Sequence, residues 1–158
     1  MAAKRRLADR LRPIRRWAAP VESAEIRWFG RSILSTTFRT PALVLETTGR
    51  RTGLRRRTPL ACHRLDDGSA GLSYAVVGGA GGQSAIPAWV ANLRADPEVV
   101  VHVGRRSFPA IAREVTGLER TRLFSRLVVV WPRIRSYEHR AGRPVPVIVL
   151  DEVLDQVG

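Results

Sequence analysis

From residue 41 onward, the sequence is divided into short apolar runs by turns that contain glycine. Most runs are rich in valine, leucine and isoleucine, and glycines punctuate the segments 49–53, 66–71 and 78–82. Runs of this kind, bounded by glycine and polar residues, are typical of β-strands joined by hairpins. The pattern predicts a mainly β chain with some helix (α+β), a small barrel of about six mostly antiparallel strands. The expected strands are 43–47, 57–65, 72–77, 99–103, 108–115 and 145–150.

The N-terminal 40 residues have a different pattern. Residues 4–17 place apolar side chains at helical spacing among basic ones, although Pro13 interrupts the run, and a second helical stretch is expected at about 23–38. We therefore expect residues 1–40 to form a helical extension and residues 41–158 to form the barrel domain. The apolar positions of the first helix are Leu7, Leu11, Ile14 and Trp17.

Peripheral helices are also expected within the barrel domain. One begins near Pro87 and ends at Asp96. Thr116 and Glu119 have the spacing of a capping box, which predicts a helix that continues to about residue 130 and ends before Pro132.

Composition narrows the function classes. With 158 residues and 44% hydrophobic side chains, the chain is long and apolar enough for one globular domain. The single cysteine, Cys62, excludes an internal disulfide and fits a reducing compartment. No apolar run approaches the length of about 20 residues that a membrane helix needs. These observations predict a cytoplasmic protein, and the basic helix at residues 4–17 adds the hypothesis of weak association with an anionic membrane surface, peripheral at the inner membrane face.

The net charge of +13 is concentrated in two segments. Residues 1–16 hold seven basic residues against one acid, and residues 50–57 hold five arginines and no acid. Guanidinium groups on a glycine-bearing turn favour an anion such as a phosphate or a carboxylate, and only Glu46 is a nearby carboxylate. The alternative is a solvated loop, because the chain as a whole uses arginine in place of lysine. Nucleic-acid binding is disfavoured because no stacking aromatic residue interrupts residues 50–57.

The segment 78–82 is a second place where backbone can approach a ligand, although a flexible hairpin loop explains it equally well. Its glycines match neither the P-loop pattern nor the dinucleotide-binding pattern. Cys62 and His63 are adjacent on an expected strand and point to opposite faces, so they are no catalytic pair, and Cys62 is expected in the core. The three histidines show no metal-ligand spacing, and no metal is predicted.

Taken in order, several motifs resemble one family. They are T-T-G-R-R-T-G at 47–53, R-R-T-P-L at 56–60, the glycines of 78–82, P-A-W with Asn92, and Asp96-Pro97. Together they are similar to the deazaflavin (coenzyme F420)-dependent nitroreductases and quinone reductases, which are split β-barrel flavin-binding proteins. The resemblance covers about residues 41–150 and implies a split barrel with the deazaflavin in a groove beside it.

The resemblance also implies roles for individual residues. Arg50, Arg51, Thr52 and Arg56 would hold the phosphate and the oligoglutamate tail. Tyr137 would hydrogen-bond the acceptor oxygen as the catalytic residue, and Trp131 and Ile134 would line the substrate where relatives often have tyrosine. The remaining cofactor-binding positions are Arg57, Thr58, Pro59, Leu60, Val77, Gly78, Gly79, Ala80, Ala88, Trp89 and Asn92.

The implied function is hydride transfer from reduced deazaflavin to a quinone-like, nitro or other conjugated apolar acceptor, with the hard chemistry supplied by the cofactor. FMN is a less favoured cofactor. Two alternatives remain open: a non-catalytic split-barrel protein that binds deazaflavin, FMN or haem, and a basic nucleic-acid-binding domain.

Overall fold

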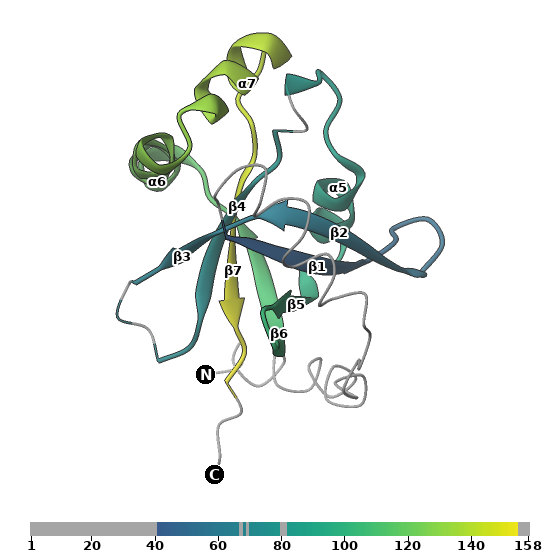
Figure 1. Ribbon diagram of the computed structural model, residues 1–158. Coiled ribbons are helices and arrows are strands. Elements are labelled where there is room, and N and C mark those ends of the chain that lie inside the picture. Colours follow the sequence, from purple (N-terminus) through teal and green to yellow (C-terminus); the bar gives the residue numbers. More distant parts are fainter. Residues whose placement is uncertain (1–40, 67, 69, 80–81, 155–158) are drawn as a thin grey trace.

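A single curled antiparallel sheet forms the body of the protein (Figure 1). The computed structural model describes residues 41–154 except 67, 69, 80 and 81. Its seven strands are ordered β2-β1-β5-β6-β7-β4-β3, and all neighbouring pairs are antiparallel. The strands are β1 (Ala42–Thr48), β2 (Arg55–Ala61), β3 (His63–Leu65), β4 (Ser73–Val77), β5 (Glu98–Val103), β6 (Arg106–Glu114) and β7 (Val147–Glu152).

The two edge strands of the sheet are consecutive in the chain. Only Cys62 separates β2, which pairs with β1, from β3, which pairs with β4. At this point the Cys62 N–H donates to the Pro41 carbonyl, 2.9 Å away, instead of to a ladder partner. The single strand expected at 57–65 is therefore two strands, because one run of chain pairs first with one edge and then with the other. This arrangement curls the sheet and confirms the split-barrel fold.

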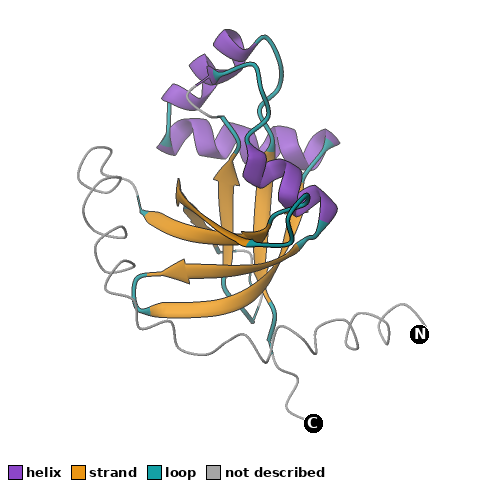
Figure 2. Cartoon of the chain, turned by 90° about the vertical axis from the view of Figure 1, so that its right-hand side faces the viewer, coloured by secondary structure: helices purple, strands orange, loops and turns teal. Residues whose placement is uncertain are grey.

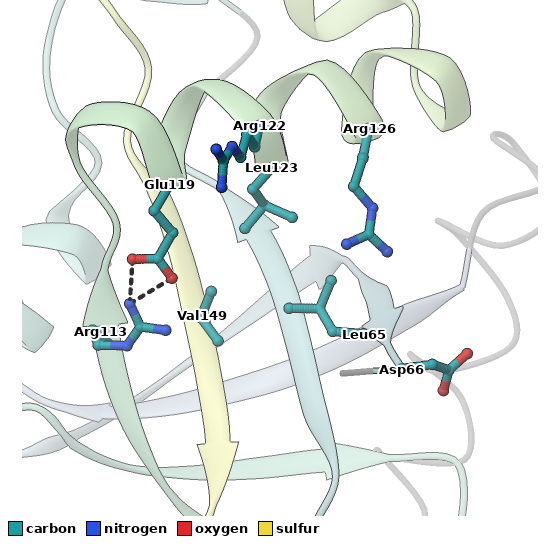
Figure 3. A pocket seen from close by; sticks show the side chains of 8 residues that line it. All are labelled: Leu65, Asp66, Arg113, Glu119, Arg122, Leu123, Arg126 and Val149. Atoms are coloured by element: carbon teal, nitrogen blue, oxygen red, sulfur yellow. Dashed lines mark hydrogen bonds and ion pairs between the residues drawn. The ribbon is translucent and has the colours of Figure 1, made fainter. Parts of the chain in front are cut away.

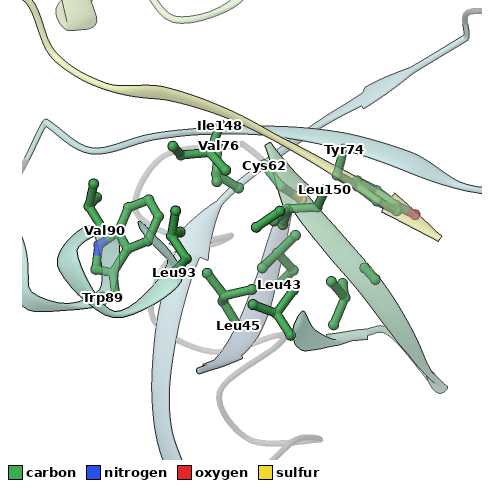
Figure 4. Packing of buried hydrophobic residues seen from close by; sticks show 14 of the residues in the cluster. Leu43, Leu45, Cys62, Tyr74, Val76, Trp89, Val90, Leu93, Ile148 and Leu150 are labelled. Atoms are coloured by element: carbon green, nitrogen blue, oxygen red, sulfur yellow. The ribbon is translucent and has the colours of Figure 1, made fainter. Parts of the chain in front are cut away.

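The barrel interior holds the larger of two apolar clusters (Figure 4). Leu43 and Leu45 enter it from β1, and Ile148 and Leu150 enter it from β7. Cys62 lies in the same cluster with none of its surface exposed, which confirms its expected place in the core. The helix α5 (Ala88–Ala95) closes the interior with three buried side chains, Trp89, Val90 and Leu93.

A second cluster lies on the other face of the sheet. Val147 and Val149 alternate along β7 with the interior residues and pack against Leu123 and Leu127 of α6 (Gly117–Val130). Since both faces of β7 are covered over residues 147–150, this part of the strand is a continuous apolar run and does not alternate. Figure 2 shows the helices gathered at one end of the strands.

The helices begin and end near their expected residues, but one of them is not capped in the expected way. Pro87 and Asp96 flank α5, and Thr116 is the N-cap of α6. The predicted capping box is wrong, because the Thr116 side chain makes no hydrogen bond to the end of the helix. Glu119 instead accepts two hydrogen bonds from Arg113, both 2.8 Å long. The last helix, α7 (Arg133–Ala141), carries Tyr137 and His139.

The helices expected within residues 1–40 lie outside the described residues. Within the described part of the chain, no helix combines the length and the apolar character needed to cross a membrane.

Candidate functional site

The turn between β1 and β2 is a compact arginine-bearing loop. The N–H groups of Thr52 and Gly53 both donate to the Gly49 carbonyl, at 3.2 and 2.7 Å. A side chain at Gly49 would place its Cβ 2.9 Å from the Thr52 hydroxyl oxygen, and Gly53 adopts a positive φ of 67°. These two requirements explain the glycines of the T-T-G-R-R-T-G motif. We call residues 49–54 the arginine turn.

Asn92 of α5 connects the arginine turn to β1 through two side-chain hydrogen bonds. Its Oδ1 accepts a hydrogen bond from the Arg50 backbone N–H at 3.1 Å, and its Nδ2 donates to the Thr47 hydroxyl at 3.3 Å. Asn92 is 7% exposed and Thr47 is fully buried. The position expected to touch a cofactor directly therefore uses both ends of its amide to fix the backbone of the turn against the barrel.

The pleat of β2 divides its arginines between two faces. Arg57 pairs with Glu46 at 2.9 Å and Arg55 lies 3.7 Å from the same carboxylate. Arg56 is opposite Thr47 in the register, so it lies on the other face, together with Thr58 and Leu60. Of the expected cofactor positions on this strand, the side chains of Arg57 and Pro59 thus point away from the face that carries Arg56.

Glu46 has a further partner, the buried His102, which the sequence analysis did not single out. His102 of β5 is 2% exposed, its Nε2 lies 3.4 Å from Glu46, and its Nδ1 lies 2.8 Å from the Ser107 hydroxyl. Burial lowers the pKa of His102 below its ordinary value, against the opposing pull of Glu46. Burial also tends to raise the pKa of Glu46, but the hydrogen bond and charge of Arg57 hold this pKa below its ordinary value.

Three arginines remain for an anion. The side chains of Arg50, Arg51 and Arg56 form no ion pair with any described residue, whereas Arg55 and Arg57 are engaged by Glu46. All three are exposed. The arginine turn, together with Arg56 of β2, therefore presents positive charge without a carboxylate partner, which is the arrangement that suits a multiply charged anion.

The glycine loop expected to run beside the cofactor contacts α7. A Cβ at Gly79 would lie 2.6 Å from the Tyr137 ring, and one at Gly82 would lie 2.9 Å from the Arg140 side chain. Arg140 also lies over the Tyr137 ring, 5.3 Å from its centroid. The structure thus brings Tyr137 onto the backbone of this loop. Gly78 is buried and its N–H donates to the Pro146 carbonyl at 2.8 Å, while Ala80 lies outside the described residues.

Arg143, a residue that the sequence analysis missed, holds the next part of the same loop. Its guanidinium donates to the carbonyls of Ser84 at 2.7 Å, Ala85 at 2.9 Å and Gln83 at 3.3 Å. This segment leads directly to Pro87 and α5. Sequence carries no local signal for such a contact, because the donor and acceptors are about sixty residues apart.

The aromatic and apolar positions expected around the cofactor and substrate are largely internal. Trp89 is 7% exposed within the interior cluster. Ile134 is 4% exposed and packs within the second cluster, and its expected substrate-lining role stays a prediction. Trp131 is half-buried, lies edge-on to His63 with ring centroids 6.2 Å apart, and has an indole N–H that is buried without a described partner.

Val77 and Ala88 lie at the two ends of the segment that joins β4 to α5. Val77 is the last residue of β4 and is half-buried against the second cluster, next to the glycine loop. Ala88 is the exposed first residue of α5, directly after Pro87. Their contact with a cofactor remains a prediction.

A split barrel that carries an exposed arginine turn fits the class of proteins that bind an anionic flavin-type cofactor. The chain belongs to the F420H(2)-dependent quinone reductase family, whose model matches residues 22–152. It is 36% identical over 115 residues to an F420H(2)-dependent quinone reductase of Mycobacterium tuberculosis, a match that covers 70% of this chain and 72% of that protein.

Two solved structures are similar in fold. An F420-H2 dependent reductase matches with a TM-score of 0.59 and 32% identity, over 70% of this chain and 93% of that one. HutZ, a haem storage protein of Vibrio cholerae, matches with a TM-score of 0.52 over 82% of this chain and 89% of its own. At 13% identity, this second likeness shows the fold alone.

The chain is therefore an F420H2-dependent oxidoreductase that acts on a small-molecule acceptor, and coenzyme F420 is its cofactor. The described residues fit that group, because three arginines without a carboxylate partner among them match an anionic tail. When bound, the reduced cofactor supplies the hydride. The protein would contribute binding and orientation, and Arg50, Arg51 and Arg56 are the residues that would hold the tail.

Proposed function

We propose that the protein reduces a quinone-like or other conjugated apolar acceptor, with the anionic tail of coenzyme F420 held by Arg50, Arg51 and Arg56. The observation that supports this proposal most is the division of the arginines, since Arg55 and Arg57 share the carboxylate of Glu46 and the other three have no such partner among the described residues. The relative from Mycobacterium tuberculosis is named as a quinone reductase, which agrees with an apolar conjugated acceptor.

We propose Tyr137 as the residue that hydrogen-bonds the acceptor oxygen. Its ring lies against Gly79 and under Arg140, so the side chain is held in place. A nearby cation favours the build-up of negative charge on the acceptor oxygen as the hydride arrives. Trp131 and Ile134 are the candidates for the apolar wall of the acceptor site.

The experiment is a fluorescence titration of coenzyme F420, with FMN titrated in parallel. The double variant Arg50→Ala/Arg56→Ala should bind F420 about 100-fold more weakly, at about tenfold for each lost charge-assisted contact. Arg105→Ala/Arg135→Ala removes the same charge at exposed positions elsewhere and should leave the affinity unchanged. Equal losses in both variants, or preference for FMN, would overturn the proposal.

The competing functions predict different results. A non-catalytic binding protein would show the same residual turnover of quinone in wild type and Tyr137→Phe, whereas we expect Tyr137→Phe to lower kcat with little change in F420 affinity. A nucleic-acid-binding domain would bind DNA or RNA with a steep salt dependence and without preference for deazaflavin.

A cytoplasmic location with weak membrane association remains a proposal that depends on residues 1–20, which lie outside the described residues. Their basic composition supports it. Pelleting with anionic liposomes should bring down the full chain and leave a chain that begins at Val21 in solution. Equal behaviour of the two chains would contradict the membrane proposal.

A further inference from the structure

A hollow of about 290 Å³ lies on the helix-covered face of the sheet (Figure 3). Its apolar lining comes from three separate elements: Leu65 from β3, Leu123 from α6 and Val149 from β7. It shares no lining residue with the arginine turn. This volume is just below the range of about 300–1,000 Å³ that is usual for ligand pockets, so the hollow suits only a small molecule.

Two carboxylates at the rim of the hollow are already neutralised. Glu119 accepts two bonds of 2.8 Å from Arg113, drawn as dashed lines in Figure 3. Asp66 lies 3.5 Å from the guanidinium of Arg64. The acidic groups that line the hollow therefore have cationic partners outside α6.

Two cations at the rim have no such partner. Arg122 and Arg126 line the hollow from α6 and form no ion pair with any described residue. Their spacing of four residues places them on one face of the helix, one turn apart. Figure 3 shows Arg126 extending from α6 toward Leu65 and Asp66. An anionic head group between these two guanidiniums would be held by charge-assisted hydrogen bonds.

We propose that this hollow is a second ligand site, which binds a small organic carboxylate that has an apolar body. The carboxylate lies between Arg122 and Arg126, and the apolar body covers Leu65, Leu123 and Val149. Both halves contribute: half-buried Leu65 and the small exposed parts of Leu123 and Val149 offer a hydrocarbon body a limited apolar surface, and the two guanidiniums offer a negative head group its counter-charge. The site is distinct from the cofactor site, and its occupancy does not depend on F420.

Isothermal titration with octanoate tests the site, with acetate and octanol as probes that lack the body and the charge. Octanoate should bind the wild-type protein with one site and more tightly than either probe. Arg122→Gln/Arg126→Gln should weaken octanoate binding at least tenfold, while Arg105→Gln/Arg135→Gln, an equal loss of charge at exposed positions, should leave it unchanged.

Amide NMR shifts supply the location. Octanoate should shift the amides of β3, β7 and α6 and leave those of the arginine turn in place. The proposal is overturned if octanoate binds no more tightly than acetate and octanol, if both double variants bind it alike, or if the shifted amides lie at residues 49–54. If the first double variant fails to fold, Arg126→Gln alone is compared with Arg105→Gln.

Discussion

Replacing Asn92 with alanine tests whether this residue shapes the cofactor site or touches the cofactor. The substitution removes two hydrogen bonds, one of 3.1 Å to the Arg50 N–H and one of 3.3 Å to the Thr47 hydroxyl. The Arg50 N–H lies in an exposed turn and can turn to water, but Thr47 is fully buried and its hydroxyl would lose a partner. At about 1 kcal/mol for the first loss and 1–2 kcal/mol for the second, we expect a destabilisation of about 2–3 kcal/mol.

For a chain of this length, about 2–4 °C of Tm per kcal/mol converts this loss into a decrease of roughly 5–10 °C, measured by thermal unfolding. The turn would lose its fixed backbone, and F420 affinity should fall about tenfold. Thr47→Val is the matched control, because it removes the hydroxyl while the bond between Asn92 and Arg50 remains. It should lower Tm with little effect on F420 binding.

Two outcomes would refute this reasoning. If Asn92→Ala lowers Tm as expected but binds F420 with wild-type affinity, the hydrogen bond to Arg50 does not position the turn. If it loses affinity without loss of stability, Asn92 contacts the cofactor directly, as the sequence motif alone suggested.

Three further predictions follow from contacts elsewhere in the molecule. Arg143→Ala should raise the KM for F420H2 several-fold with a smaller change in kcat, because the loop at 83–85 loses its bonds, and an unchanged KM would exclude this role. Because the pKa of Glu46 is lowered by folding, its carboxylate contributes stability that is present above the ordinary pKa of 4.5 and is lost as the pH falls through the lowered pKa. Glu46→Gln should therefore make the free energy of unfolding less dependent on pH in acid, and an unchanged pH dependence would contradict this. Burial raises the pKa of the Cys62 thiol to about 12, so a thiol reagent at pH 7.5 should label it only after unfolding, and rapid labelling of the native protein would show that it is accessible.

Local patterns predicted much of the fold. Short apolar runs and glycine turns identified the strands, and Pro87 and Asp96 delimited α5, because strand and helix propensities, capping and turn chemistry act over a few residues. The break at Cys62 was not predictable, since it depends on which strands the two halves of 57–65 pair with.

The candidate site shows the same division. The sequence determined the composition of the arginine turn, its glycines and the presence of Tyr137 near the end of the chain. Only the tertiary structure decided which arginines are available, because the register of β1 and β2 places Glu46 beside Arg57 and leaves Arg56 on the other face.

The other features of the site depend on contacts between segments that are distant in the sequence. Asn92 reaches Arg50 across 42 residues, and Arg143 reaches Ser84 across 59. The sequence by itself therefore determined the family, the cofactor chemistry and the local elements, which are encoded in motifs of a few residues. The hydrogen bonds of Asn92 and Arg143 and the burial of Ile134 were decided by the tertiary structure, because both depend on neighbours that folding alone brings together.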